Sequence, residues 1–114
     1  MKLITDEHRI TMFANDQRYA ADPGFDPVPV VKIFSPVGSA TWFLCSLDRE
    51  DPDIAFGLCD LGFGTPELGS VRISEMESCV LPLGLRIERD LSFRPSKTLG
   101  QYAEEARLRG YIDA

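Results

Sequence analysis

The sequence predicts an α+β fold in which a small antiparallel β-meander of three to five strands packs with an N-terminal and a C-terminal helix. Short apolar segments recur at residues 30–34, 41–47, 54–59 and 68–73, each bounded by turn residues, as is typical of strands. Five to seven residues separate the central segments, too few for the crossover that parallel strands require. A helix-start signal stands at Thr5, and the chain is expected to turn helical again from Thr98, which gives one helix near each end.

The first helix is predicted from residue 5 to about residue 17. Thr5 is a suitable N-cap, and Asp6 and Glu7 place negative charge on the first turn, where it favours helix formation. We expect two to three turns. Residues 20–29 follow as a loop, because three prolines and a glycine restrict the backbone there.

The central hairpin, residues 40–61, organises the predicted sheet. Strict alternation over its first strand puts two sets of side chains on opposite faces: Thr41, Phe43, Cys45 and Leu47 on one, and Trp42, Leu44 and Ser46 on the other. Both sets are largely apolar, so this strand is expected to be covered on both sides. Gly57, in the return strand, marks either a bulge or a place where a neighbouring aromatic ring lies over the backbone.

The second half of the chain contains shorter elements. Residues 61–66 form a glycine-rich connection without the lysine of a phosphate-binding loop. Ser74 followed by Glu77 is a capping-box pattern that predicts a helical turn. Residues 85–93 are predicted to be extended. From Thr98 an apolar stripe of Leu99, Tyr102 and Ala106 predicts a helix that ends at Gly110.

Composition narrows the functional classes. The 114 residues fit one domain, residues 1–114, with 44% hydrophobic and 26% charged residues. A net charge of −6 argues against direct binding of nucleic acid, and no apolar run is long enough to span a membrane. Three cysteines without a CxxC pair, and a single histidine, predict no metal site and no cofactor. A reducing cytoplasmic location fits this cysteine usage best.

The candidate binding residues are Trp42, Glu67, Glu88, Arg89 and Asp90. In residues 87–90 two carboxylates flank a guanidinium, a pattern that suits either a binding site or a structural salt-bridge cluster. Trp42 suits either a core position or a ligand platform. No catalytic residue is assigned, because His8 is the only imidazole and no GxSxG motif is present.

Several segments together resemble a small bacterial family, the domain of unknown function 2958. They are residues 32–36, the Thr41-Trp42 pair, Asp48, residues 56–57 and 67–69, Glu75, and the run GLRIERDLSFRP at residues 84–95. The resemblance covers residues 32–95, and the tail from Lys97 is expected to lie beyond it. Ser70 and Val71 stand where the family usually carries aromatic residues. The resemblance implies no activity, cofactor or catalytic residue. It implies a setting on mobile or horizontally acquired DNA, and hence an accessory role.

Our leading hypothesis is a non-enzymatic protein-binding module that presents the Trp42 hairpin and residues 88–90 to a protein partner. One alternative is a small metal-assisted enzyme that uses carboxylates from Glu67, Glu75, Glu88 or Asp90. A second is an acidic inhibitor of a nucleic-acid-handling protein. A structural subunit is a third, and the oligomeric state stays open.

Overall fold

The structure is a computed structural model that describes residues 2–113 of the chain. Its elements, in chain order, are α1 (Asp6–Ala21), β1 (Val31–Phe34), β2 (Thr41–Leu47), β3 (Ile54–Asp60), β4 (Glu67–Arg72), α2 (Ile73–Ser78), the 3₁₀ turn η1 (Pro82–Gly84), β5 (Glu88–Arg89) and α3 (Leu99–Arg109).

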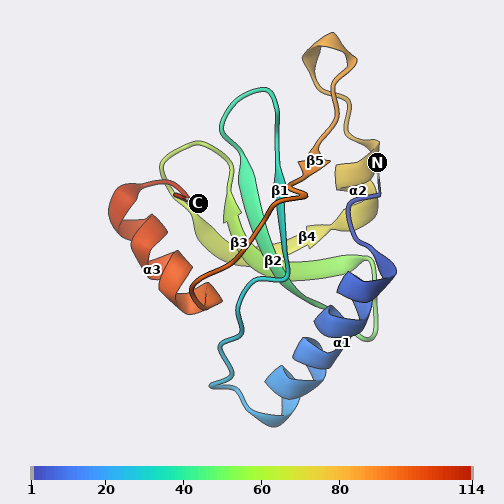
Figure 1. Cartoon of the computed structure of the whole chain (residues 1–114), viewed down its shortest axis with the longest axis vertical. Helices are drawn as coiled ribbons and strands as arrows, with labels where there is room; N and C mark the ends of the chain where they lie inside the picture. Colours follow the sequence, from blue (N-terminus) through green and yellow to red (C-terminus); the bar gives the residue numbers. More distant parts are fainter. Residues whose placement is uncertain (1, 114) are drawn as a thin grey trace.

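The five strands form one antiparallel sheet in the order β4-β3-β2-β1-β5. Strands β1 to β4 follow one another as a meander, and β5 returns to pair with the outer side of β1. Helices α1 and α2 pack on one face of the sheet and α3 on the other (Figure 1). The prediction of an α+β fold is therefore confirmed.

Strand β2 supplies both hydrophobic cores. Trp42 and Leu44 point into the larger core, which α1, α2 and the segment before α1 cover. Phe43 and Cys45 point into the smaller core beneath α3. The prediction of a strand that is apolar and covered on both faces is thus confirmed, and these four residues alternate as expected.

The alternation breaks at a β-bulge. Leu44 lies opposite Gly57 and Ser46 lies opposite Phe56, so Cys45 has no residue facing it across the ladder. An extra residue in one strand reverses the faces of the residues that follow. Leu47 therefore points into the larger core with Trp42, and the prediction that it shares a face with Phe43 is wrong.

Two residues stabilise the bulge. A Cβ atom placed on Gly57 would lie 1.9 Å from the carbonyl oxygen of Phe43, so only glycine allows β3 to approach β2 this closely. The buried side chain of Asn15 on α1 donates from Nδ2 to the carbonyl oxygen of Cys45 at 2.8 Å. A bulge was one of the two roles predicted for Gly57. The aromatic ring of the neighbouring strand, Trp42, faces Cys59 across the ladder and not Gly57.

Helix α1 is longer than predicted, with 16 residues ending at Ala21. Its last turn is held by tertiary contacts that local propensity does not show. The ring of Tyr19 packs edge-on against Phe25 and Phe56, with centroids 5.3 and 6.2 Å apart. The helix stops just before Pro23, since the residue preceding a proline avoids helical geometry.

The predicted Ser74 cap is wrong. Helix α2 begins at Ile73, and its N-cap is Arg72, which lies two residues before the predicted cap and makes no side-chain cap bond. Asp53, from the turn between β2 and β3, accepts hydrogen bonds from the Ser74 backbone nitrogen at 2.9 Å and from the Ser74 hydroxyl at 2.6 Å. These bonds, with that from Arg72, hold the pKa of Asp53 below its usual value.

Helix α3 matches its prediction. Thr98 and Gln101 form a reciprocal capping box, and Gly110 ends the helix in the left-handed region at φ 83°. Asp26 strengthens the N-terminus, because it accepts from the Thr98 hydroxyl at 2.6 Å and from the Gly100 nitrogen at 2.8 Å. The long loop before β1 is thereby tied to the C-terminal helix.

We expect Gly57→Ala to destabilise the protein by about 2–4 kcal/mol, because the new methyl group would overlap the β2 backbone. Gly69→Ala is the matched control: Gly69 faces Gly57 across the ladder, and a Cβ there meets nothing within 4 Å. Urea unfolding of the two variants checks the prediction. Equal losses of stability in both would contradict it.

We also expect His8 to make stability depend on pH. Its Nδ1 accepts from the Thr5 nitrogen at 3.2 Å, a bond that a protonated imidazole cannot accept. Partial burial, and then the positive charge of Arg89, lower the pKa of His8 below 6.5. The unfolded chain thus binds a proton more readily than the folded one. Stability should be fully present above pH 6.5 and fall as the pH drops through 6.5 toward the lower folded pKa.

His8→Gln tests this, because glutamine can complete a capping box as Gln101 does with Thr98, yet does not titrate. Melting temperatures measured between about pH 7.5 and about pH 5.5 should fall less in the variant than in the original chain. An identical fall in both proteins would show that His8 is not responsible.

Candidate functional site

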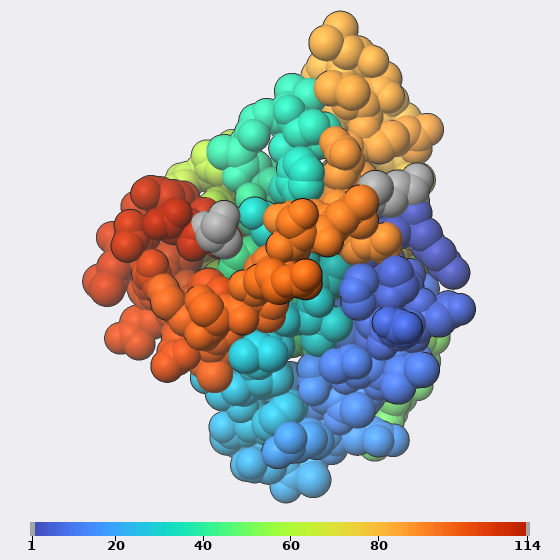
Figure 2. Space-filling model, in the orientation of Figure 1, coloured from blue at the N-terminus to red at the C-terminus, as the bar shows by residue number. Residues whose placement is uncertain are grey.

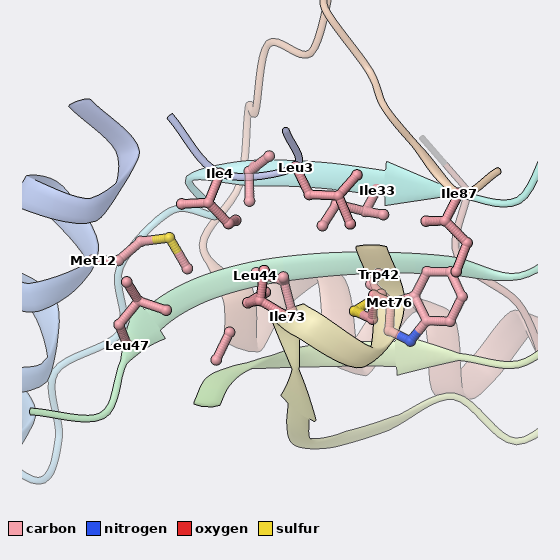
Figure 3. Packing of buried hydrophobic residues seen from close by; sticks show 12 residues of the cluster. Leu3, Ile4, Met12, Ile33, Trp42, Leu44, Leu47, Ile73, Met76 and Ile87 are labelled. Atoms are coloured by element: carbon pink, nitrogen blue, oxygen red, sulfur yellow. The ribbon is translucent and has the colours of Figure 1, made fainter. Parts of the chain in front are cut away.

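Trp42 is a core residue. Only 8% of its surface is exposed, and it lies in the larger core with Met76 and Ile87 (Figure 3). This burial agrees with the core position that was one of the two alternatives for Trp42. The pairing of β5 with β1 turns Ile87, the residue before β5, inward over the sheet, where it packs in the same core as Trp42.

Residues 88–90 tie the sheet edge together. Glu88 and Arg89 pair with Phe34 and Ile33 of β1. Asp90 lies 3.5 Å from the ammonium group of Lys32, and Arg89 donates from Nη1 to the carbonyl oxygen of Lys2 at 2.6 Å. These contacts agree with the salt-bridge alternative, in which the run joins β5 to β1 and to the start of the chain.

Glu67 lies far from residues 88–90. It is on β4, at the opposite edge of the sheet from Glu88 on β5. Four inter-strand steps separate these two strands, roughly 19 Å. Across residues 2–113 no group of three or more His, Cys, Asp or Glu side chains is placed to hold a metal ion. The geometry thus brings no support to an enzyme built on these carboxylates.

Cys45 and Cys59 offer no activated nucleophile. Burial raises the pKa of Cys45 to about 12 and that of Cys59 to about 11, so both thiols are protonated at neutral pH. His8, the only imidazole, is engaged by the Thr5 backbone. No helix within residues 2–113 combines the length and the apolar character that crossing a membrane requires.

Three loops lie at the same end of the sheet: residues 35–40 after β1, 61–66 after β3, and 80–87 before β5 (Figure 1). We call them the loop end. Antiparallel pairing places them together, since β1 and β3 finish, and β5 starts, at the same edge of the ladder. Six apolar side chains are exposed there: Val37, Leu61, Phe63, Val80, Leu83 and Leu85.

The most prominent of these loops is a short finger, residues 80–86, which extends beyond the body of the molecule (Figure 2). Its tip is the turn Leu81-Pro82-Leu83-Gly84, closed by a hydrogen bond from the Gly84 nitrogen to the Leu81 oxygen at 3.1 Å. Leu83 has φ 65° and ψ 17°, the third-position geometry of a type II turn. That position normally takes glycine or asparagine, yet here it carries a leucine that is 95% exposed.

Hydrogen bonds hold the base of the finger in place. Val80 and Arg86 form an antiparallel bridge, and the Leu81 nitrogen donates to the Leu85 oxygen at 2.8 Å. Arg86 donates from Nη1 to the Glu77 carbonyl oxygen at 3.3 Å, and Ile87 is buried in the larger core. The apolar tip is thus held away from the core by its own hydrogen bonds.

The loop after β3 is anchored by a buried carboxylate. Asp60, 2% exposed, accepts from the Gly62 nitrogen at 2.8 Å and from the Ile112 nitrogen at 3.0 Å. Gly62, at φ 87°, lies so close to the neighbouring loop that a Cβ there would be 2.5 Å from the Ser39 hydroxyl oxygen. Phe63, 82% exposed, is therefore displayed from a fixed backbone.

Sequence reasoning missed the loop end because its residues were treated as connections. The sequence feature that could have identified the loop end is the scarcity of charged residues in these loops. Among the 20 residues of the three loops Arg86 alone is charged, in a chain where 26% are. Turns usually expose polar side chains, so Leu83 beside Pro82, and Phe63 between two glycines, stand out.

Comparison with known proteins gives a family and no activity. No curated protein and no solved structure matches the chain significantly. A family model described as "Protein of unknown function (DUF2958)" matches residues 3–113. The match extends beyond the segment 32–95 on which the resemblance was noted, and it includes the tail from Lys97 that was expected to lie outside. The chain therefore belongs to the DUF2958 family of proteins of unknown function.

Proposed function

We propose that this protein is a non-enzymatic binding module that docks its loop end against a partner protein, with Leu83 as the central anchor. The observation that carries the proposal is the exposed, uncharged tip of the finger. Solvation does not favour an exposed leucine, and the left-handed backbone at Leu83 adds a cost of about 1–2 kcal/mol. A glycine would avoid both penalties at this turn position.

The surroundings of Leu83 suit a protein interface. The centres of such interfaces are depleted in charged residues, and the loop end holds a single one. Loops held by a rigid sheet are also the usual place for binding residues. Nucleic acid is a poor partner for this surface, since Arg86 is its only cation and the whole chain carries a net charge of −6.

The fixed backbone lowers the cost of binding. Pro82 restricts the turn before Leu83, and the hydrogen bonds of the finger are already formed in the free protein. Burial of one leucine side chain contributes about 1.5–3 kcal/mol, roughly a tenfold to a hundredfold change in affinity. A role as an accessory factor for another protein is consistent with this mode of binding.

We expect Leu83→Gly to lose partner binding while the fold is kept. The substitution removes the apolar side chain and relieves the strained backbone. Glycine also raises the conformational entropy of the unfolded chain, which offsets the stability gained from that relief. The melting temperature should therefore change by only a few degrees. Ile10→Ser is the matched control, because Ile10 is 72% exposed on α1, outside the loop end.

Each protein is immobilised and exposed to extract of its source cell, and any recovered protein is purified and titrated directly. The original chain and Ile10→Ser should bind it equally, and Leu83→Gly should bind at least about tenfold more weakly. A partner bound equally by all three proteins would overturn the proposal. Flotation with neutral phosphatidylcholine vesicles that depends on Leu83 would also overturn it, because the surface would then be a membrane contact.

A further inference from the structure

A groove of 350 Å³ lies at the opposite end of the sheet from the loop end, beside the turn between β2 and β3. It lies beside the edge of the smaller core, where Phe43, Cys45 and Leu58 are buried and Phe56 packs against them only partly buried. Ile54, Phe56 and Ser70 line it from β3 and β4, and Tyr19 lines it from α1. None of the residues so far assigned to binding takes part in it.

An unpartnered hydroxyl opens into this groove. Ser46 lines it, is 4% exposed, and forms no side-chain hydrogen bond with the residues the structure describes. Among those residues no fully enclosed side-chain oxygen or nitrogen lacks a partner, so the Ser46 oxygen must be reached from the groove. The bulge at Cys45 places it there, because Ser46 faces Phe56 across the ladder. The Ser46 hydroxyl, on a side chain that is otherwise buried, is therefore available to hydrogen-bond a ligand in the groove.

Two carboxylates also line the groove. Asp48 uses Oδ1 to accept from the Glu50 nitrogen at 2.7 Å and from the Asp51 nitrogen at 3.3 Å, which leaves Oδ2 for a ligand. Asp16 lies on α1, and its Oδ2 is 3.4 Å from Nε of Arg49. An adjoining hollow shares Asp16, Tyr19 and Asp48 and adds Ala20, Arg49 and Glu50. The groove therefore favours a cation.

Aromatic rings complete the surface. Tyr19 and Phe56 pack edge to face, and burial raises the pKa of Tyr19 to about 12, so its phenol is neutral at physiological pH. A guanidinium already stacks in this neighbourhood, since Cζ of Arg18 lies 4.1 Å from the centre of the Phe25 ring. Such planar cations bind favourably over aromatic faces.

We propose that the groove binds an arginine side chain of a partner protein. A guanidinium has five N–H donors in one plane, which suits two carboxylates and a hydroxyl better than the compact ammonium group of lysine does. Its plane can lie against Phe56 while its edge meets Asp16, Asp48 and Ser46. Arg49 occupies one oxygen of Asp16 in the free protein, and therefore competes with the incoming arginine.

The test uses N-acetyl-arginine amide as the probe in an NMR titration of the full chain, with N-acetyl-citrulline amide as an uncharged probe of the same shape. Backbone signals of residues 46, 56 and 70 should shift with the arginine probe and not with citrulline. Asp16→Asn and Ser46→Ala should each weaken binding, the former by about tenfold. Arg49→Ala should strengthen binding, because it frees Asp16.

Asp6→Asn is the matched control, since Asp6 is an exposed carboxylate on the same helix and should leave the titration unchanged. Equal shifts with citrulline, an unaltered titration in Asp16→Asn, or weaker binding in Arg49→Ala would each overturn the proposal. Leu83→Gly should bind the probe like the original chain, because the loop end is at the other end of the sheet. The two proposals can therefore fail independently.

Discussion

The close contact between β2 and β3 at Gly57 determines much of this structure. Only a residue without Cβ fits against the Phe43 carbonyl, and the bulge at Cys45 follows directly in the facing strand. The bulge would leave a buried carbonyl without a partner, and Asn15 supplies one from α1. This one local irregularity thus fixes where α1 docks, and it turns Leu47 toward the larger core and Ser46 toward the groove.

The same sheet separates two kinds of surface. At the loop end, turns with almost no charge display leucine and phenylalanine side chains. At the other end, the turn between β2 and β3 carries four acidic residues, and its Asp48 lines the groove. A meander makes this separation possible because alternate connections lie at opposite ends of the strands. An apolar contact and an ionic contact can therefore be made without interfering with each other.

Sequence reasoning predicted the parts of the fold that depend on local pattern. The strands, the antiparallel order, the Thr5 cap and the Gly110 stop follow from alternation, short connections and capping chemistry. It did not predict the features that depend on contacts between residues far apart in the sequence. Ser74 has the sequence of a cap, yet Asp53 from another turn bonds to it. The bulge alone determines which face of the sheet Leu47 and Ser46 point to, and a bulge depends on both paired strands.

The candidate binding residues show the same limit of sequence reasoning. Trp42, Arg89 and Asp90 attracted attention as chemically distinctive residues, but each has a structural contact that accounts for its presence: core packing, a bond to Lys2 and an ion pair with Lys32. Leu83 is chemically ordinary, and the fold makes no use of its side chain. A residue that adds strain and exposed apolar surface, without a stabilising contact in return, is better explained by a binding partner than by the fold.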